Sequence, residues 1–130
     1  MVIHIDTQSA SPIYEQIRDQ VVLGIAGGKL TPDEGLPSVR RLAADLGINF
    51  HTVSKSYTQL TDEGYIAMDR QRGAVVGHLK KRSVGFIEKL KQKLTLVSAE
   101  AICNDISEND FVALCTDCYT NVKKGGTSNA

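Results

Sequence analysis

The sequence predicts a mainly α-helical protein with one small β-hairpin. Three observations indicate this fold class. Apolar residues recur at helical spacing in five segments, two short β-compatible runs follow the third segment, and the basic run Lys80-Lys81-Arg82 separates three helices from the last two. We therefore expect a domain over residues 1–80, a two-helix region over residues 81–124 and a disordered tail over residues 125–130.

The composition excludes several classes of protein. The chain has 130 residues, 42% of them hydrophobic, and its 15 Lys and Arg balance its 15 Asp and Glu. This length suits one domain, or a small domain with an appendage, and leaves little room for a cofactor domain joined to a substrate domain. A zero net charge excludes a uniformly basic architectural protein, but it does not exclude a locally basic surface that binds nucleic acid.

The sequence also favours a cytoplasmic protein without a membrane partner. Its longest apolar stretch, residues 21–26, is far shorter than the roughly 20 residues that a spanning helix needs. The N-terminus lacks the basic region and long apolar core of a secretory signal. Three cysteines, an odd number, argue against a disulfide framework and for a reducing compartment.

The first predicted helix starts at a Ser-Pro pair. We expect Ser11 to cap it and Pro12 to occupy its first helical position, while Gly27-Gly28 ends it. Residues 30–37 contain two prolines and a glycine and are predicted to form a loop. The apolar face of this helix is predicted to consist of Ile13, Ile17, Val21 and Ile25.

The next two helices are short and adjacent in sequence. Ser38 is the expected cap of the first, which Gly47 ends, and Asn49 is the expected cap of the second, which Gly64 ends. A helix, a glycine turn and a second helix with a polar outer face predict a helix-turn-helix. The residues predicted to face the core are Val39, Leu42, Ala43 and Leu46, followed by Val53, Ser56, Tyr57 and Leu60.

The polar residues of this arrangement predict DNA binding. The second helix of such a motif places its N-terminal side chains in the major groove, where they hydrogen-bond base edges or phosphates. Residues 65–68 and 74–76 form a predicted hairpin, or wing, whose arginines lie beside a glycine where backbone can approach DNA. The residues that supply these groups are His51, Thr52, Ser54, Lys55, Arg70, Arg72 and Gly73.

The charges gather where this prediction needs them. Residues 38–58 hold three basic residues against Asp45, a local charge of +2, and residues 69–82 hold five basic residues against Asp69, a local charge of +4. The local field near DNA matters more than the global sum.

The chain contains an ordered string of motifs: Leu36-Pro37-Ser38-Val39-Arg40-Arg41-Leu42-Ala43, Gly47-Ile48-Asn49, Thr52-Val53-Ser54-Lys55-Ser56-Tyr57, Leu60 and Gly64-Tyr65-Ile66. From about Ser11 to Val76, this string resembles the GntR family of bacterial transcription regulators. The short helical region that follows is similar to the YtrA-type subfamily, whose short tails dimerise. The resemblance implies a winged helix-turn-helix regulator, a repressor, that binds a pseudo-palindromic operator as a homodimer.

The resemblance also implies which residues contact DNA. Arg40 is expected to do so at the start of the second helix, together with the polar positions of the recognition helix and Arg72-Gly73 in the wing. With the residues around both helix caps included, the predicted DNA-binding set is Ser38, Arg40, Arg41, Asn49, His51, Thr52, Ser54, Lys55, Arg70, Arg72 and Gly73.

The sequence departs from the family pattern at four places. Asp33-Glu34-Gly35 stands where the family usually has a Gly-Asp pair, so this loop is expected to differ. Arg41 occupies a position that is often acidic, and Ala74 replaces a common wing threonine that can donate to phosphate. Phe50-His51 replaces a more usual polar or proline pair, which leaves the base preference open.

The C-terminal region predicts a dimer. Its first helix has apolar residues spaced 3, 4, 3, 4, the rhythm of a helix–helix seam, and Ser107 to Asp110 resembles a capping box that starts a last helix. Because so short a region cannot build a stable core alone, we expect a second copy to cover it. The predicted interface residues are Ile87, Leu90, Leu94, Val97, Ala101, Phe111, Leu114 and Cys118.

The Cys115-x-x-Cys118 pair leaves an alternative open. Two cysteines three residues apart on a helical stripe are more often small buried hydrophobes than metal ligands, and a zinc site needs four ligands at regular spacing. We expect no metal, no cofactor and no catalytic site. The alternative is a ligand- or metal-responsive sensor whose Cys-bearing C-terminal helices switch DNA affinity; a module that has lost DNA binding is disfavoured by the retained Arg40 and wing arginines. No effector can be named from the sequence.

Overall fold

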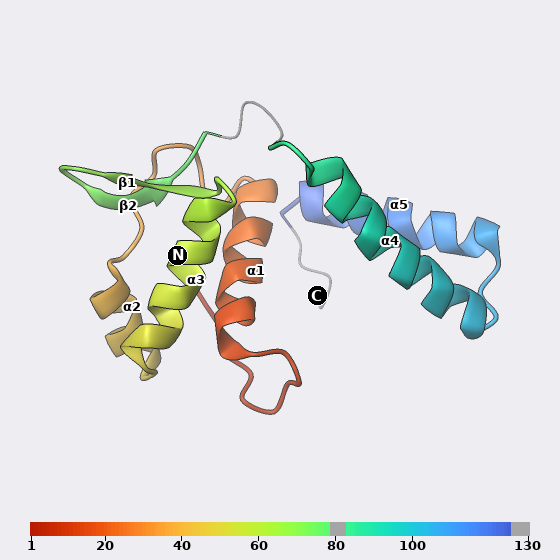
Figure 1. The fold of residues 1–130 in the computed structure, drawn as a ribbon, viewed down its shortest axis with the longest axis horizontal. Helices are drawn as coiled ribbons and strands as arrows, with labels where there is room; N and C mark the ends of the chain where they lie inside the picture. The colour runs from red at the N-terminus through yellow and green to blue at the C-terminus, as the bar shows by residue number, and fades with distance from the viewer. Residues whose placement is uncertain (79–82, 126–130) are drawn as a thin grey trace. The chain divides into compact units, whose positions relative to one another are not determined.

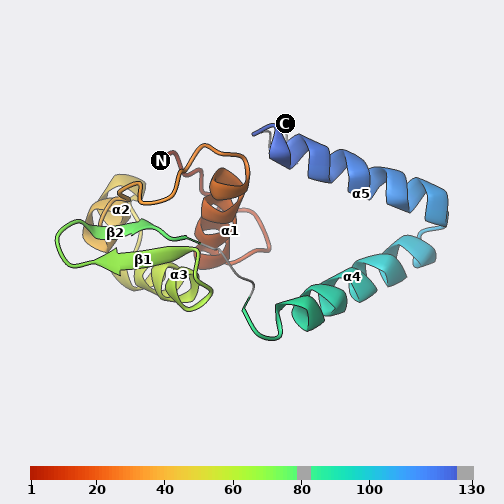
Figure 2. The same ribbon diagram turned by 90° about the horizontal axis from the view of Figure 1, so that it is seen from above.

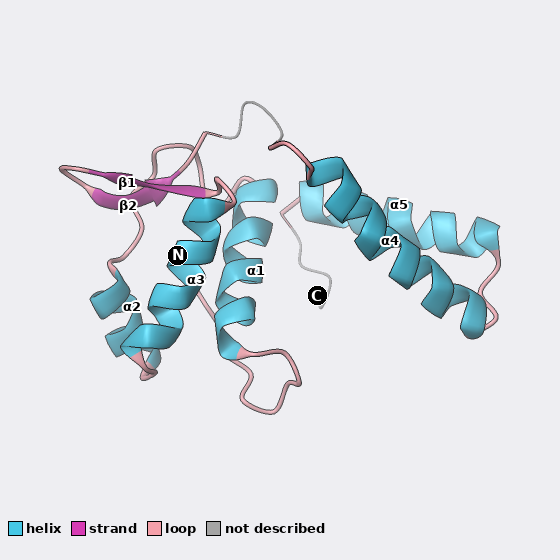
Figure 3. Ribbon diagram, viewed as in Figure 1, coloured by secondary structure: helices cyan, strands magenta, loops and turns pink. Residues whose placement is uncertain are grey.

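The computed structural model describes residues 1–78 and 83–125 (Figure 1). It is mainly helical with one antiparallel hairpin, as predicted (Figure 3). The chain forms two compact units, which we call the winged unit, Met1–Leu79, and the tail unit, Lys80–Ala130. The elements are α1 (Ile13–Ala26), α2 (Val39–Leu46), α3 (Phe50–Asp62), β1 (Ile66–Asp69), β2 (Gly73–Val76), α4 (Phe86–Cys103) and α5 (Glu108–Lys123).

The start of α1 differs from the prediction. Pro12, not Ser11, is the N-cap, with an extended backbone and a carbonyl that accepts from the N–H groups of Glu15 and Gln16. The Ser11 carbonyl accepts instead from the Gln16 side chain, which also pairs with the backbone of Asp6. The Gln16 amide therefore ties the N-terminal segment to α1, and the predicted serine cap is wrong by one position.

The caps of α2 and α3 are confirmed. The Ser38 hydroxyl oxygen accepts from the Arg41 N–H at 3.1 Å, and the Asn49 side-chain oxygen accepts from the His51 N–H at 2.7 Å. Gly47 ends α2 with φ of 66°, a left-handed conformation that glycine adopts without a steric penalty. These caps fix where the two short helices begin, and so which side chains lie in their first turns.

The wing contains one more pairing than the sequence indicates. β1 and β2 pair in the register from Ile66 opposite Val76 to Asp69 opposite Gly73. Residues 33–36, predicted as a loop, pair with β2 through an isolated antiparallel bridge. In this pairing the Leu36 N–H donates to the Ala74 carbonyl at 2.8 Å. The segment before α2 is therefore fixed to the wing.

The winged unit has a closed apolar core. The predicted inward faces of α1, α2 and α3 meet there with the inner side of the wing, and Tyr57 packs within it as expected. The residues of this core are Ile17, Val21, Leu30, Leu36, Leu42, Ala43, Val53, Tyr57, Leu60, Ile66, Ala74 and Val76.

The tail unit is open. Ser107 caps α5 by accepting from the Asp110 N–H at 3.2 Å, as predicted, and α4 and α5 diverge from the turn between them (Figure 2). Cys115 and Cys118 are exposed in the single chain, so their burial stays a prediction that depends on the expected dimer. Residues 79–82 and 126–130, which include the basic run and most of the predicted tail, lie outside the described residues. In the described ranges, no helix has the length and apolar character of a membrane span.

Candidate nucleic-acid interface

The first turns of α2 and α3 lie together. The Arg40 guanidinium stacks over the Phe50 ring, with its carbon 5.4 Å from the ring centroid. Arg40 is exposed at the start of α2, and Phe50 is the first residue of α3. The side chain of Arg40 therefore connects the first turn of α2 to the first residue of α3, and its positive charge makes this surface a favourable place for phosphate.

Most of the predicted polar residues fall in or beside these turns. His51 is exposed, while Thr52 and Ser54 are half-buried, and none of the three belongs to the buried face of α3. The Arg41 Nε lies 3.8 Å from the Asp45 carboxylate on the surface of α2, and a fully exposed pair of this kind holds its partners weakly. Arg41 is thus available to another anion. Ser38 and Asn49 use their side-chain oxygens as caps, so their position is set by helix formation itself.

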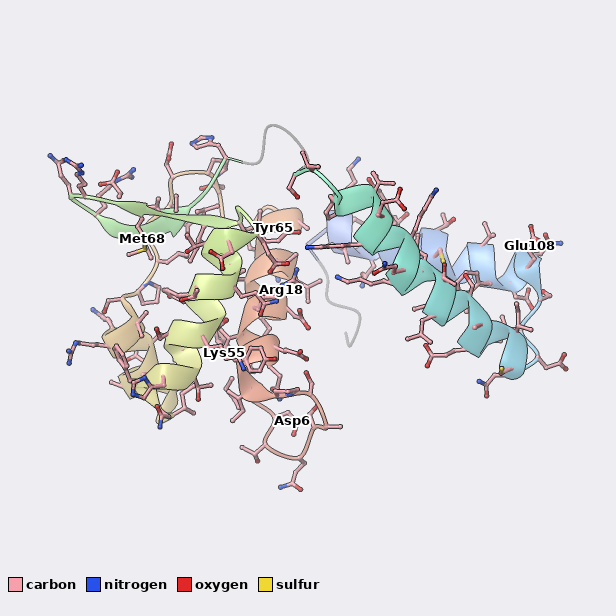
Figure 4. All side chains as sticks on the ribbon, viewed as in Figure 1. Asp6, Arg18, Lys55, Tyr65, Met68 and Glu108 are labelled. Atoms are coloured by element: carbon pink, nitrogen blue, oxygen red, sulfur yellow. The ribbon has the colours of Figure 1, made fainter. Side chains whose placement is uncertain are left out.

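Lys55 does not extend freely from α3. Its ammonium nitrogen lies 4.0 Å from the centroid of the Tyr14 ring on α1, a cation–π contact (Figure 4). Sequence spacing placed Lys55 on the polar side of α3, and it could not show that Tyr14 lies beside it. A DNA contact by Lys55 therefore stays a prediction, and it requires this contact to be released or shared.

The two wing arginines differ in their surroundings. Arg70 is exposed at the tip, whereas the Arg72 Nη1 donates to the Asp33 carbonyl at 2.8 Å and its Nη2 lies 3.4 Å from the Asp69 carboxylate. Asp69 also accepts from the N–H groups of Gln71 and Arg72, and these bonds, with Arg72, lower the pKa of its carboxyl. Asp69 thus fixes the turn of the wing. Gly73, the first residue of β2, has a left-handed backbone with φ of 76°.

Comparison with known proteins identifies the family. Residues 13–76 match the profile of bacterial regulatory proteins of the gntR family. The HTH-type transcriptional repressor YtrA of Bacillus subtilis is 37% identical over 102 residues, which cover 77% of this chain and 78% of the relative. The chain belongs to the GntR family. It is a DNA-binding transcriptional regulator with a winged helix, related to YtrA.

Solved structures share this fold. YtrA from Sulfolobus acidocaldarius, a GntR-family transcription factor, is 39% identical with a TM-score of 0.62, over 79% of this chain and 99% of that chain. A transcriptional antiterminator from Listeria monocytogenes EGD-e is 26% identical with a TM-score of 0.87, over 98% and 96% of the two chains.

The loop at Asp33, one of the places where this chain departs from the GntR pattern, has a structural role. Asp33, where a Gly-Asp pair is usual, has φ of 67°, a left-handed conformation that Asp tolerates better than most side chains. Its carboxylate lies 2.7 Å from Nε2 of His78, just after β2, and 3.9 Å from Arg72. The altered loop thus forms a polar link to the wing. The sequence indicated that the loop would differ, but not that His78 would meet it.

Two further contacts brace the helices behind the interface. The Tyr57 hydroxyl on α3 donates to the Pro37 carbonyl at 2.7 Å, and burial raises the pKa of Tyr57 to about 12. Arg18 on α1 makes a two-pronged contact with Glu63 at the end of α3 and lies over the Tyr65 ring (Figure 4). Hydrogen bonding to Glu63 raises the pKa of Arg18.

Metal binding gains no support from the described side chains. Within residues 1–78 and 83–125, no three His, Cys, Asp or Glu residues lie together as ligands for one ion. The residue of the interface that sequence reasoning missed is Phe50. The sequence did contain a sign of its role. Phe50 is an aromatic residue in the first turn of the predicted recognition helix, but it is not part of that helix's apolar stripe.

Proposed function

We propose that this chain is a transcriptional repressor that binds a pseudo-palindromic operator as a homodimer. The observation that carries the proposal is the contact between Arg40 in the first turn of α2 and Phe50 at the start of α3, which places an exposed arginine beside the polar side chains of the expected recognition helix. The name of the Bacillus subtilis relative, a transcriptional repressor, supports the sign of regulation. The protein would act in the cytoplasm, on DNA, and not as an enzyme.

In this proposal residues 1–80 bind DNA and residues 81–124 dimerise. Ile87, Leu90, Leu94 and Val97 on α4 are between 38% and 47% exposed in the single chain, so a continuous apolar stripe is open to a partner. On α5, Leu114 and Cys118 are exposed as well, and Phe111 is half-buried. A two-fold dimer would cover this surface and would present two recognition helices to two half-sites.

Within the interface, we assign unequal roles to the predicted residues. Arg40, His51 and Thr52 would reach base edges or phosphates, because they are exposed or half-buried in the first turns. Arg70 would contact the backbone or minor groove from the wing tip. Arg72 would act mainly by fixing the wing against Asp33, as its contacts support.

A salt-titrated binding assay tests this function. Fluorescence anisotropy with the duplex upstream of the chain's own gene is expected to show tighter binding than with a scrambled duplex, and a steep loss of affinity with salt. Arg40→Ala should weaken binding by about 1–3 kcal/mol if Arg40 reads a base. Lys29→Ala, which removes an equal charge from the turn after α1, is the matched control and should change binding little. Equal affinity for both duplexes, or an Arg40→Ala variant that binds as the wild type does, would contradict the proposal.

The second candidate is a metal- or ligand-responsive sensor, for which the exposed cysteine pair of α5 would supply the responsive groups. Cys115 and Cys118 lie about one turn apart, a spacing that two ligands of one zinc ion can share. Elemental analysis of protein purified under reducing conditions distinguishes the two functions. One equivalent of zinc per chain, with DNA affinity that changes when the zinc is removed, would favour the sensor.

A further inference from the structure

Phe50 is exposed at a place where a polar residue would suit solvent better. The side chain is 41% exposed, although it is the first residue of a helix whose buried face begins at Val53 and continues with Ser56 and Tyr57. The core of the winged unit is closed without Phe50. Part of its aromatic surface is therefore left open outside the core.

Two neighbours hold the ring in place. Arg40 from α2 covers one face at 5.4 Å, and the His51 ring meets it edge-on at a centroid distance of 5.6 Å and an interplanar angle of 84°. A cation over one face and an aromatic edge beside it each favour a fixed ring orientation. The rest of the ring forms an apolar spot between two side chains that can hydrogen-bond.

Double-stranded DNA offers one clear match to such a spot. Phosphates and most base edges in the major groove present charge or hydrogen-bonding groups, which an aromatic ring cannot satisfy. The C5-methyl group of thymine is the apolar group on that edge, and a phenyl ring is one of the side chains that contact it. Arg40 and His51 beside the ring carry the groups that would bond neighbouring bases or phosphates.

We infer that Phe50 is a specificity-determining residue that contacts a thymine methyl group in each half-site of the operator. The inference rests on the proposed DNA-binding function. A contact with thymine would also explain why an aromatic residue stands where the family usually has a polar residue or proline.

Deoxyuridine tests the contact directly, because it differs from thymidine by the methyl group alone. The full-length chain is first used to select its preferred duplexes from a random pool, and each thymine of the selected site is then replaced in turn by uracil. One position in each half-site is expected to lose about fourfold in affinity, the value of one buried methyl-sized group. The Phe50→Ala variant should bind the thymine and uracil duplexes equally, and Phe50→Leu should keep part of the difference.

Thr58→Ala is the matched control, because Thr58 is exposed on the same helix, lies outside the predicted DNA-binding set and should keep the sensitivity to uracil. Circular dichroism of each variant checks that α3 remains folded. The inference is overturned if wild-type protein binds its selected site and no thymine responds to uracil, or if Phe50→Ala retains the full response. A wild-type chain that selects no sequence at all would instead overturn the proposed function, and the inference with it.

Discussion

The two units of this chain bury their apolar residues to very different extents. In the winged unit, three helices and a hairpin enclose a core in which Ile17, Val53 and Leu60 are fully buried. In the tail unit, Ala101 at 7% exposure is the buried apolar residue among those the structure describes, while Leu94 and Leu114 are open. Both units carry apolar stripes at helical spacing, so the stripe alone does not make a core.

The difference lies in how many surfaces each unit brings to its stripes. α3 is packed against α1 and α2 and continues into β1, so its apolar face is covered on several sides. α4 and α5 diverge, and neither covers the other along its length (Figure 2). A unit of this kind gains stability when a second chain supplies the missing surface.

The largest expected effect comes from charging the open stripe. The double substitution Leu90→Asp and Leu94→Asp places two carboxylates per chain in the proposed interface, where burial of an unpaired charge is strongly unfavourable. We expect loss of the dimer and, since two linked half-site contacts become separate, a fall in operator affinity of about 100-fold or more. Light scattering and anisotropy measure the two effects.

Leu96→Asp is the control for that experiment. Leu96 is exposed on α4 but lies off the 3, 4 stripe, so the same charge there should leave the dimer intact. Equal dissociation by both changes would show that charge on α4, and not the stripe, controls assembly.

A cavity in the winged unit should affect folding and leave assembly alone. Leu60→Ala removes a fully buried side chain and should lower the free energy of unfolding by about 2–5 kcal/mol. Urea unfolding followed by circular dichroism measures the loss, and sedimentation measures the dimer. A weakened dimer with unchanged unfolding would contradict the division into two units.

A smaller effect is expected from the ion pair that joins α1 to the end of α3. Glu63→Gln removes the less exposed of the two carboxylates that pair with the Arg18 guanidinium, which should cost about 1–2 kcal/mol. Asp19→Asn is the control, because Asp19 meets the same arginine at an exposed position and should matter less. Urea unfolding of both variants in parallel checks the order, and an equal loss from the two would contradict it.

The smallest effect depends on pH. Because burial raises the pKa of Tyr57 from 10.0 to about 12, the neutral hydroxyl is favoured in the folded state. The stability that this contributes is fully present below pH 10 and is lost as pH rises toward 12. Tyr57→Phe should cost about 1 kcal/mol at neutral pH, through the lost bond to Pro37, and should flatten the alkaline decline in urea unfolding. Tyr119→Phe, at an exposed site on α5, should leave that decline unchanged.

The sequence predicted features that depend on neighbours within one helical turn. The caps at Ser38, Asn49 and Ser107 followed from residues two or three positions away, and the buried face of α3 followed from its spacing. The start of α1 is the exception, since its N-cap is Pro12 and not Ser11.

Contacts between distant segments were not predictable from one sequence. Arg72 and Asp33 are separated by 39 positions, and their bond depends on how the loop before α2 adds to β2. The Lys55–Tyr14 and Arg40–Phe50 contacts depend likewise on which helices are neighbours. Such pairs change how candidate site residues are interpreted, because they decide which charges are free to bind DNA.

The mass of the purified chain in solution tests the central claim most directly. Sedimentation equilibrium at micromolar concentration, under reducing conditions, is expected to give twice the mass of one chain, with loss of that mass in the Leu90→Asp, Leu94→Asp variant. A single-chain mass for the wild type, with α4 and α5 still helical by circular dichroism, would contradict the claim that a second copy completes the tail unit.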